Sequence, residues 1–349
     1  MLLNGKQARG AHLVGSFPLA SSEEVFRAVA VTLGEHLRRM PDRETGVRNG
    51  WLRWQHPLFA NNSAFEQAAE EPGVYGPVRV LRVREAARTD ELTFSALGYA
   101  DAAIASYREF TELQRTGAVP SHIRFQVCLP TPLAPVSSFV ALDDRSLVEP
   151  VYQRRMLAEL DAMLAAIPAA QLAIQWDVAV EVAVLEGIAP THLQDPWTDI
   201  TERLAQLGEA VPREVELGYH FCYGFRAQQH FKEPADLGLV VRLANAVAGS
   251  SVRPLTWVHM PVPRTRDDDG YFAPLDELQL APETEVYLGL VHYHDGVSGA
   301  ERRIAAARRH LTSFGVATEC GMGPRPAETI PELLRIHAAV AAPSTRPTA

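Results

Sequence analysis

The chain has 349 residues, close to half of them hydrophobic, and a formal net charge of −9 from 33 basic and 42 acidic residues. This length suits one large barrel with insertions, and the apolar content is enough for a single core. The basic residues are scattered rather than striped, which argues against nucleic acid as a partner. No apolar run approaches the ~18 residues that cross a membrane, and the first ten residues lack the apolar core of a secretory signal. We therefore expect a cytoplasmic protein that binds neither nucleic acid nor membrane; the sequence carries no signal for or against an oligomer.

Short apolar runs alternate with amphipathic helical patterns, and the period of the apolar residues changes from two to 3.6 each time. Eight runs predict strands, at residues 11–17, 36–41, 122–129, 171–176, 214–221, 254–259, 285–291 and 315–319. Helical patterns between them include residues 22–33, 101–115, 151–166, 200–207, 235–247 and 300–313. Eight strands with helical or loop crossovers predict a parallel (β/α)8 barrel, an α/β fold. We expect one barrel domain over residues 1–341 and a flexible tail rich in Pro, Ser and Thr over residues 342–349.

A doubly wound parallel sheet is the main alternative to the barrel. That fold requires a glycine-rich phosphate-binding turn after the first strand, and Gly15-Ser16-Phe17-Pro18 is not such a turn. The irregular stretch over residues 42–93 predicts a long excursion from the second strand. Long loops on this fold usually shape the active site.

Polar residues gather at the predicted carboxyl ends of the strands, which is the edge where barrel enzymes bind their substrates. The residues at this edge are Ser16, Asp42, Glu44, Asp177, His220, Cys222, His259, His292, His294, Glu319 and Cys320. Two of the three cysteines and four of the twelve histidines therefore lie at one rim. As alternatives, Asp42 and Glu44 could cap a loop, and His292 and His294 could be rim histidines that do not touch substrate.

His220 and Cys222 are two residues apart, so on an extended strand both side chains point the same way. Barrel closure places strands five to eight in one arc, so that Cys320 and His259 can reach the same point. Thiolate and imidazole together select zinc, and three protein ligands leave a fourth position open. We therefore predict one Zn²⁺ held by His220, Cys222 and Cys320. The alternative is that these cysteines are inert buried thiols, which is the favoured interpretation for Cys128 in its apolar strand.

The rim residues resemble the catalytic barrel of the cobalamin-independent methionine synthases. That barrel belongs to the uroporphyrinogen decarboxylase-like superfamily, which also includes epoxyalkane:coenzyme M transferase. In the synthases an H-x-C pair, a Glu and a late Cys hold a zinc that activates a thiol for methyl transfer. The runs that carry the resemblance are Val14-Gly15-Ser16-Phe17-Pro18, Ile174-Gln175-Trp176-Asp177, His220-Phe221-Cys222-Tyr223-Gly224 and Glu319-Cys320-Gly321-Met322-Gly323. The resemblance implies that Ser16 meets an amino-acid substrate, that Asp177 holds its amine, and that His294 transfers a proton.

The chain also departs from the family's pattern. His259 stands in place of the zinc Glu, so we expect His259 as the fourth protein ligand. The family's D-E-P becomes Asp177-Val178-Ala179, and Leu129-Pro130-Thr131-Pro132 lacks the tryptophan that stacks on folate. We expect no counterpart of the duplicated N-terminal barrel of the full-length synthases, since these 349 residues suit one barrel. The zinc and the fold therefore carry over, whereas methyltetrahydrofolate and homocysteine do not.

The resemblance predicts a zinc-dependent methyl- or alkyltransferase, whose substrates are a small thiol and an alkyl donor with an electrophilic carbon. A thiol bound to Zn²⁺ loses its proton because the cation stabilises the thiolate. We expect Asp177 as the amine anchor, Ser16 and His292 as substrate contacts, and Asp42 or Glu44 as a second anchor. The alternatives are a hydrolase or lyase that uses zinc-activated water, a metal-free decarboxylase-like enzyme, and a non-catalytic binder of zinc or a small ligand. The clustered titratable rim argues against the last.

Overall fold

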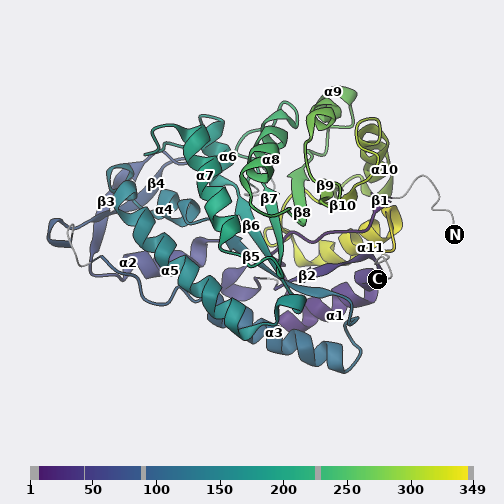
Figure 1. The fold of residues 1–349 in the computed structure, drawn as a ribbon, viewed down its shortest axis with the longest axis horizontal. Helices are drawn as coiled ribbons and strands as arrows, with labels where there is room; N and C mark the ends of the chain where they lie inside the picture. Colours follow the sequence, from purple (N-terminus) through teal and green to yellow (C-terminus); the bar gives the residue numbers. More distant parts are fainter. Residues whose placement is uncertain (1–7, 43, 88–91, 225–228, 345–349) are drawn as a thin grey trace.

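The computed structural model describes residues 8–42, 44–87, 92–224 and 229–344. A parallel sheet of seven strands curls through the middle of the molecule in the order β10-β9-β8-β7-β6-β5-β2 (Figure 1). These strands are β2 (Arg39–Pro41), β5 (Arg124–Pro130), β6 (Leu172–Val178), β7 (Glu216–Phe221), β8 (Trp257–Pro261), β9 (Glu285–Val291) and β10 (Gly315–Thr318). Ala11 takes the eighth place, because it forms parallel bridges to Leu37 on one side and to Val316 on the other. The fold is a (β/α)8-type barrel, as predicted.

Helices cover the outside of the sheet and connect its strands (Figure 1). They are α1 (Ser22–Leu33), α3 (Tyr99–Arg115), α4 (Leu133–Phe139), α5 (Arg145–Ala166), α6 (Val180–Leu185), α7 (Pro196–Glu209), α8 (Gly238–Ser250), α9 (Asp269–Phe272), α10 (Gly296–Ala307) and α11 (Ile330–Val340). The first of them begins where the Ser21 side chain accepts a hydrogen bond from the Glu24 backbone N–H, which satisfies one free donor of the helix. Within the described residues, none of the helices has the length and apolar character that a membrane span requires.

The excursion after β2 has more regular structure than the sequence predicted. It contains the short helix α2 (His56–Ala60) and an antiparallel hairpin of β3 (Phe65–Glu71) and β4 (Val78–Val83), which lies at the end of the molecule opposite the termini (Figure 1). Its first part, residues 44–55, returns over the barrel. Asn49 reaches the loop that follows β10: a Cβ atom on Gly323 would clash with the Asn49 carbonyl oxygen. The first part of the excursion therefore covers the carboxyl edge of the sheet.

The predicted first strand, residues 11–17, is wrong beyond its first residue. Ala11 N–H donates to the His36 carbonyl and His12 N–H to the Val316 carbonyl, but no further ladder forms. Instead, side chains from inside the barrel satisfy the backbone: Gln126 Nε2 donates to the Leu13 carbonyl at 3.2 Å, and Gln175 Nε2 to the Val14 carbonyl at 2.6 Å. Because these carbonyls already have partners, the chain from Leu13 onward is free to bend across the mouth of the barrel.

The start of the predicted tail is part of the folded body. Ala342 lies in β11 (Ala341–Ala342), which pairs in parallel with β1 (Ala8–Arg9). The Ser344 backbone N–H donates to the Glu35 carbonyl at 2.8 Å. The remainder of the predicted tail, residues 345–349, lies outside the described residues.

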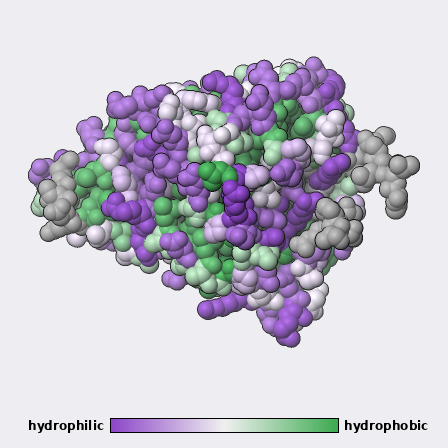
Figure 2. All heavy atoms as spheres, in the orientation of Figure 1, coloured by the Kyte–Doolittle hydropathy of each residue, from purple (hydrophilic) through white to green (hydrophobic). Residues whose placement is uncertain are grey.

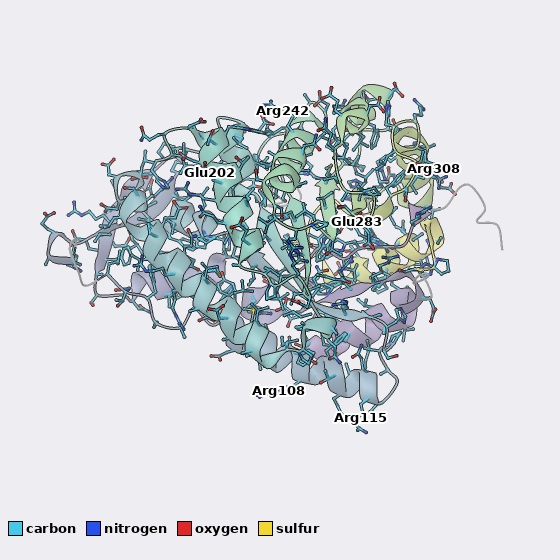
Figure 3. All side chains as sticks on the ribbon, viewed as in Figure 1. Arg108, Arg115, Glu202, Arg242, Glu283 and Arg308 are labelled. Carbon is cyan, nitrogen blue, oxygen red and sulfur yellow. The ribbon has the colours of Figure 1, made fainter. Side chains whose placement is uncertain are left out.

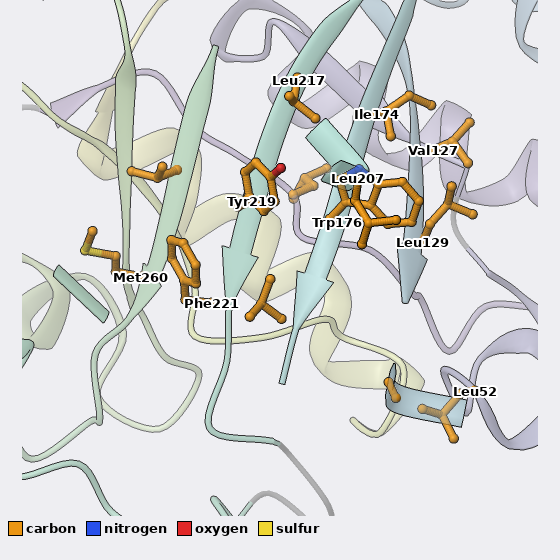
Figure 4. Packing of buried hydrophobic residues seen from close by; sticks show 14 of the residues in the cluster. Leu52, Val127, Leu129, Ile174, Trp176, Leu207, Leu217, Tyr219, Phe221 and Met260 are labelled. Carbon is orange, nitrogen blue, oxygen red and sulfur yellow. The ribbon is translucent and has the colours of Figure 1, made fainter. Parts of the chain in front are cut away.

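Alternation along the strands decides which side chains enter the barrel. Figure 4 shows the apolar set that faces the surrounding helices, with Val127 and Leu129 on β5, Ile174 and Trp176 on β6, and Leu217, Tyr219 and Phe221 on β7. Since successive side chains on a strand point to opposite faces, the intervening residues point inward. On β6 and β7 these inward residues are Gln175, Asp177, Gly218 and His220, all of them polar or small. The interior of this barrel is therefore polar toward its carboxyl edge.

Charged side chains lie mainly on the outer helices. Arg108 on α3, Glu202 on α7 and Arg242 on α8 are exposed and project away from the sheet (Figure 3). Polar residues of the visible face are interspersed with smaller apolar areas (Figure 2). The surface therefore matches the scattered charge that the sequence indicates.

Gly289 on β9 permits the close approach of the chain before Cys320, and an alanine at this position is expected to destabilise the barrel. A Cβ atom at this position would lie 2.6 Å from the Glu319 Cα, a backbone atom that cannot rotate away. We expect G289A to lower the free energy of unfolding in urea by about 1–3 kcal/mol. The control is G249A on α8, where an added Cβ meets no atom within 4 Å and stability is expected to stay equal or to rise by up to about 1 kcal/mol. Equal stability of G289A and the wild type would contradict the close approach.

Candidate metal centre

His220, Cys222 and Cys320 meet at the carboxyl edge of the sheet. His220 lies on β7, Cys222 follows it, and Cys320 comes two residues after β10. One ligand atom from each lies within 4.8 Å of the others, and the two sulfur atoms are 3.4 Å apart. His220 and Cys222 are buried, and Cys320 is partly exposed. The three predicted ligands are thus brought together from strands that are about 100 residues apart in sequence.

The donor set and its spacing fit a zinc ion. Two Zn–S bonds of about 2.3 Å at a tetrahedral angle place their sulfur atoms about 3.8 Å apart, close to the separation seen here. One imidazole and two thiols supply the soft nitrogen and sulfur donors that zinc prefers. Three protein ligands leave a fourth tetrahedral position for a substrate.

Burial sets the protonation of the ligands before any metal binds. The hydrogen bond with Cys320, together with burial, raises the pKa of the Cys222 thiol well above its usual range. Burial, with His259 and His12 nearby, lowers the pKa of His220 well below its usual value. At neutral pH the site therefore presents a neutral imidazole and a protonated thiol. Metal binding must displace the thiol proton.

His259 lies beside His220 but has partners within the protein. The register of β7 and β8 pairs the two residues, and their Nδ1 atoms are 2.7 Å apart. His259 Nε2 donates to the Thr318 carbonyl at 3.0 Å. The sequence predicted His259 as a fourth zinc ligand. A bond to the metal would require one of these two contacts to break.

The predicted substrate anchors form a second group next to the cysteines. The β6–β7 register places Asp177 beside His220, and Gln175 Nε2 donates to Asp177 Oδ1 at 2.9 Å. Asp42 pairs with Arg48 of the excursion at 2.8 Å. Burial, followed by the charges of Asp42 and Asp177, raises the pKa of Glu44 well above its usual range. Asp42, Glu44 and Asp177 thus form one cluster, and each is at least nine-tenths buried.

The pKa of Asp177 rises to about 7, and desolvation by burial is the main cause. Glu44 also has a left-handed backbone, with φ at 35°, a conformation that only surrounding contacts can maintain in a non-glycine residue. Perturbed carboxylates and local strain are common at functional sites. This carboxylate cluster (Asp42, Glu44 and Asp177) includes the Arg48–Asp42 ion pair, and the raised pKa values of Glu44 and Asp177 make it a candidate site for a cationic group.

Ser16 lies against the loop that follows Cys320. The Met322 N–H donates to the Ser16 carbonyl at 2.8 Å, and a Cβ atom on Gly321 would lie 2.9 Å from Ser16 Oγ. Glycine at position 321 therefore permits the close approach that places the serine hydroxyl beside the metal centre. Ser16 therefore lies next to the loop that carries Cys320, and its contact with a substrate stays a prediction.

The two predicted rim histidines differ in their surroundings. His292 is buried, its Nε2 donates to the Val262 carbonyl at 2.9 Å, and its Nδ1 lies 3.7 Å from Glu319 Oε1. His294 is exposed, with its ring beside that of Tyr293. His292 is therefore held in the interior beside Glu319, whereas His294 faces solvent, and the roles predicted for both stay predictions.

Sequence reasoning missed a charged cluster around Glu319, the residue before Cys320. His230 Nε2 lies 3.2 Å from Glu319 Oε2, and Arg325 lies 3.6 Å from Oε1. Burial raises the pKa of Glu319, but the hydrogen bond to His230 and the neighbouring His292 and Arg325 lower it overall. His230 and Arg325 come from loops with no distinctive spacing, so no sequence signal could have joined them to the site.

No model of a known protein family matches the sequence, and a search of curated proteins also gives no match. Solved structures do match over nearly the whole chain. A B12-independent methionine synthase from Shewanella sp. W3-18-1, in complex with selenomethionine, has a TM-score of 0.55 at 12% identity, over 95% of this chain and 96% of that one. A putative vitamin-B12 independent methionine synthase from Listeria monocytogenes has a TM-score of 0.55 at 14% identity, over 96% and 98%. A methyltransferase from Methanosarcina mazei has a TM-score of 0.54 at 10% identity, over 96% and 94%.

The chain has the fold of the B12-independent methionine synthases. At these identities the likeness establishes the fold, and it agrees with the resemblance drawn from the sequence. The likeness extends over almost the entire length of each matched chain.

Proposed function

We propose that this protein is a zinc-dependent methyl- or alkyltransferase that acts on a small thiol. The supporting observation is that His220, Cys222 and Cys320 converge beside a cluster of buried carboxylates. Zn²⁺ bound there would lower the pKa of a thiol in its open position and make it a nucleophile at neutral pH. The matched structures include a methionine synthase in complex with selenomethionine, a putative methionine synthase and a methyltransferase.

The chain's own residues would bind and orient an amine-bearing thiol. Asp177 would accept the ammonium group, with Asp42 or Glu44 as a second anchor, because these three buried carboxylates lie close enough to raise the pKa of Glu44. Ser16 would offer a hydroxyl from beside the loop that carries Cys320. His292 would contact the substrate, and His294 would deliver a proton to the leaving group. Together these residues would hold the sulfur in line with the donor carbon.

The test is thiol-dependent turnover by protein purified without chelator and shown to hold about one zinc per chain. Homocysteine, cysteine and 2-mercaptoethanol are combined with a methyl or alkyl donor panel of a sulfonium, an aromatic methyl ether and an epoxide. We expect a thioether product only when thiol, donor and zinc are all present. Equal consumption of the donor without any thiol would contradict the proposal and indicate zinc-activated water. Protein that neither holds nor takes up zinc would exclude the metal chemistry altogether.

The pH dependence of amine recognition follows from Asp177. Its raised pKa of about 7 means that the side chain is neutral below pH 7 and charged above it. We expect kcat/KM for an accepted thiol that bears an amine, relative to a matched thiol without one, to increase about tenfold from pH 6 toward pH 8. Thiol ionisation affects both substrates, so the ratio isolates the amine contact. The D177N variant should make this ratio independent of pH; an unchanged profile in D177N would remove Asp177 from amine binding.

A further inference from the structure

A chain of hydrogen bonds runs from β10 through β8 to the metal ligand on β7. The Thr318 carbonyl accepts from His259 Nε2 at 3.0 Å, and His259 Nδ1 lies 2.7 Å from His220 Nδ1. All three residues are buried, and His259 has no exposed surface. The site's nitrogen ligand is thus connected to the backbone of the strand that precedes Cys320.

The chemistry of these groups determines where each proton lies. A carbonyl oxygen can only accept, so His259 Nε2 must carry the proton of that bond. A neutral imidazole has one N–H, so His259 Nδ1 is a bare acceptor. His220 Nδ1 must then donate the second bond, and the lone pair of a neutral His220 is on Nε2. The remaining nitrogen is the one available to a metal.

Thr318 also contacts the backbone of the cysteine ligand Cys320. Its hydroxyl donates to the Cys320 carbonyl at 2.8 Å, while its own carbonyl receives the bond from His259. Thr318, at the end of β10, therefore holds the backbone of Cys320 in position. Through His259 it also sets the orientation of the His220 ring. The β7–β8 register, which pairs His220 with His259, keeps the two rings at the same height.

We propose that His259 is a positioning residue that fixes His220 in the Nδ1–H tautomer and so directs its Nε2 atom to the metal. The inference rests on the metal site of the proposed function. It replaces the role of ligand that the sequence suggested for His259. Partners of this kind orient ligating histidines, and their loss typically weakens metal binding 10–100-fold without abolishing it.

The experiment compares two substitutions of His259 that differ in one respect. H259L removes both hydrogen-bonding nitrogens, whereas H259N can place an amide oxygen near the former Nδ1 position and accept from His220. The matched control is H337L, since His337 is equally buried and donates to the Leu333 carbonyl within α11. Co²⁺ affinity is measured by chelator competition, the sulfur-to-cobalt absorption band reports the thiolate ligands, and ¹⁵N NMR of labelled histidine gives the His220 tautomer in metal-free protein.

We expect H259L to bind Co²⁺ 10–100-fold more weakly with the sulfur-to-cobalt band retained. H259N should stay within a few-fold of the wild type, and H337L should be unchanged. Near-complete loss of Co²⁺ in both His259 variants, with an altered band, would make His259 a ligand and overturn the inference. Unchanged affinity in H259L would also overturn it.

The NMR measurement does not depend on the variants folding or on metal being bound. A proton on His220 Nδ1 in the wild-type protein supports the inference, and a proton on Nε2 overturns it. If the wild type binds no metal at all, the proposed function fails, while the tautomer still decides the role of His259.

Discussion

Replacing either Cys222 or Cys320 by serine is expected to leave the purified protein without zinc while the barrel stays folded. Zinc sites of this type bind with about 10–16 kcal/mol in total, so losing one of three protein ligands should cost roughly 3–5 kcal/mol, or two to four orders of magnitude in affinity. The two sulfur atoms lie 3.4 Å apart at the edge of the sheet, outside the apolar core that stabilises the strands. Zinc content by mass spectrometry and competition titration measures the loss, and urea unfolding checks the fold.

Cys128 provides the matched control for these two substitutions. It is buried in β5, and its thiol donates to the Val14 carbonyl at 3.1 Å rather than joining the metal group. We expect C128S to keep its zinc and to change stability only modestly, because a hydroxyl can donate the same bond. Zinc loss in C128S as well as in the other two variants would indicate that cysteine replacement harms the fold and would remove support for the three-ligand site.

The strands and the metal triad could be predicted because their signals are local. Seven strands show apolar runs at the correct places, and the H-x-C spacing on an extended strand is sufficient to predict that His220 and Cys222 point the same way. Cys320 follows from barrel closure, which brings the end of the last strand beside strand five. Each of these steps depends on alternation or on topology, and both can be read from the sequence.

The course of residues 12–17 and the role of His259 could not be predicted, because both depend on contacts between residues far apart in the sequence. The bend after Ala11 depends on the amides of Gln126 and Gln175, which lie more than 100 residues away and satisfy backbone carbonyls in place of a ladder. Whether His259 binds metal or another side chain depends on a carbonyl on β10 and a ring on β7. Hydrogen bonds between distant polar groups leave no periodicity in the sequence. The resemblance to a zinc family suggested a ligand at His259, and the contacts favour a supporting role.

His294 is the least constrained of the predicted catalytic residues, and its replacement tests the proton-transfer step. We expect H294A to keep its zinc and to reduce kcat for thiol alkylation by about 10²- to 10⁴-fold, the usual contribution of a positioned acid or base. Its ring is exposed to solvent. A donor with a more acidic leaving group needs less protonation, so the deficit of H294A should shrink with such a donor.

His292 is the alternative to His294 as the residue that delivers the proton. It lies two positions earlier, buried and 3.7 Å from Glu319, so it has a stable orientation but less access to solvent. As a substrate contact, H292A should raise KM more than it lowers kcat. Zinc content is measured in both variants. If H292A shows the large loss in kcat and its dependence on the leaving group, while H294A turns over normally, then proton delivery belongs to the buried histidine beside Glu319. Loss of zinc from H294A would instead make His294 a ligand and leave the proton donor to be sought among Asp42 and Glu44.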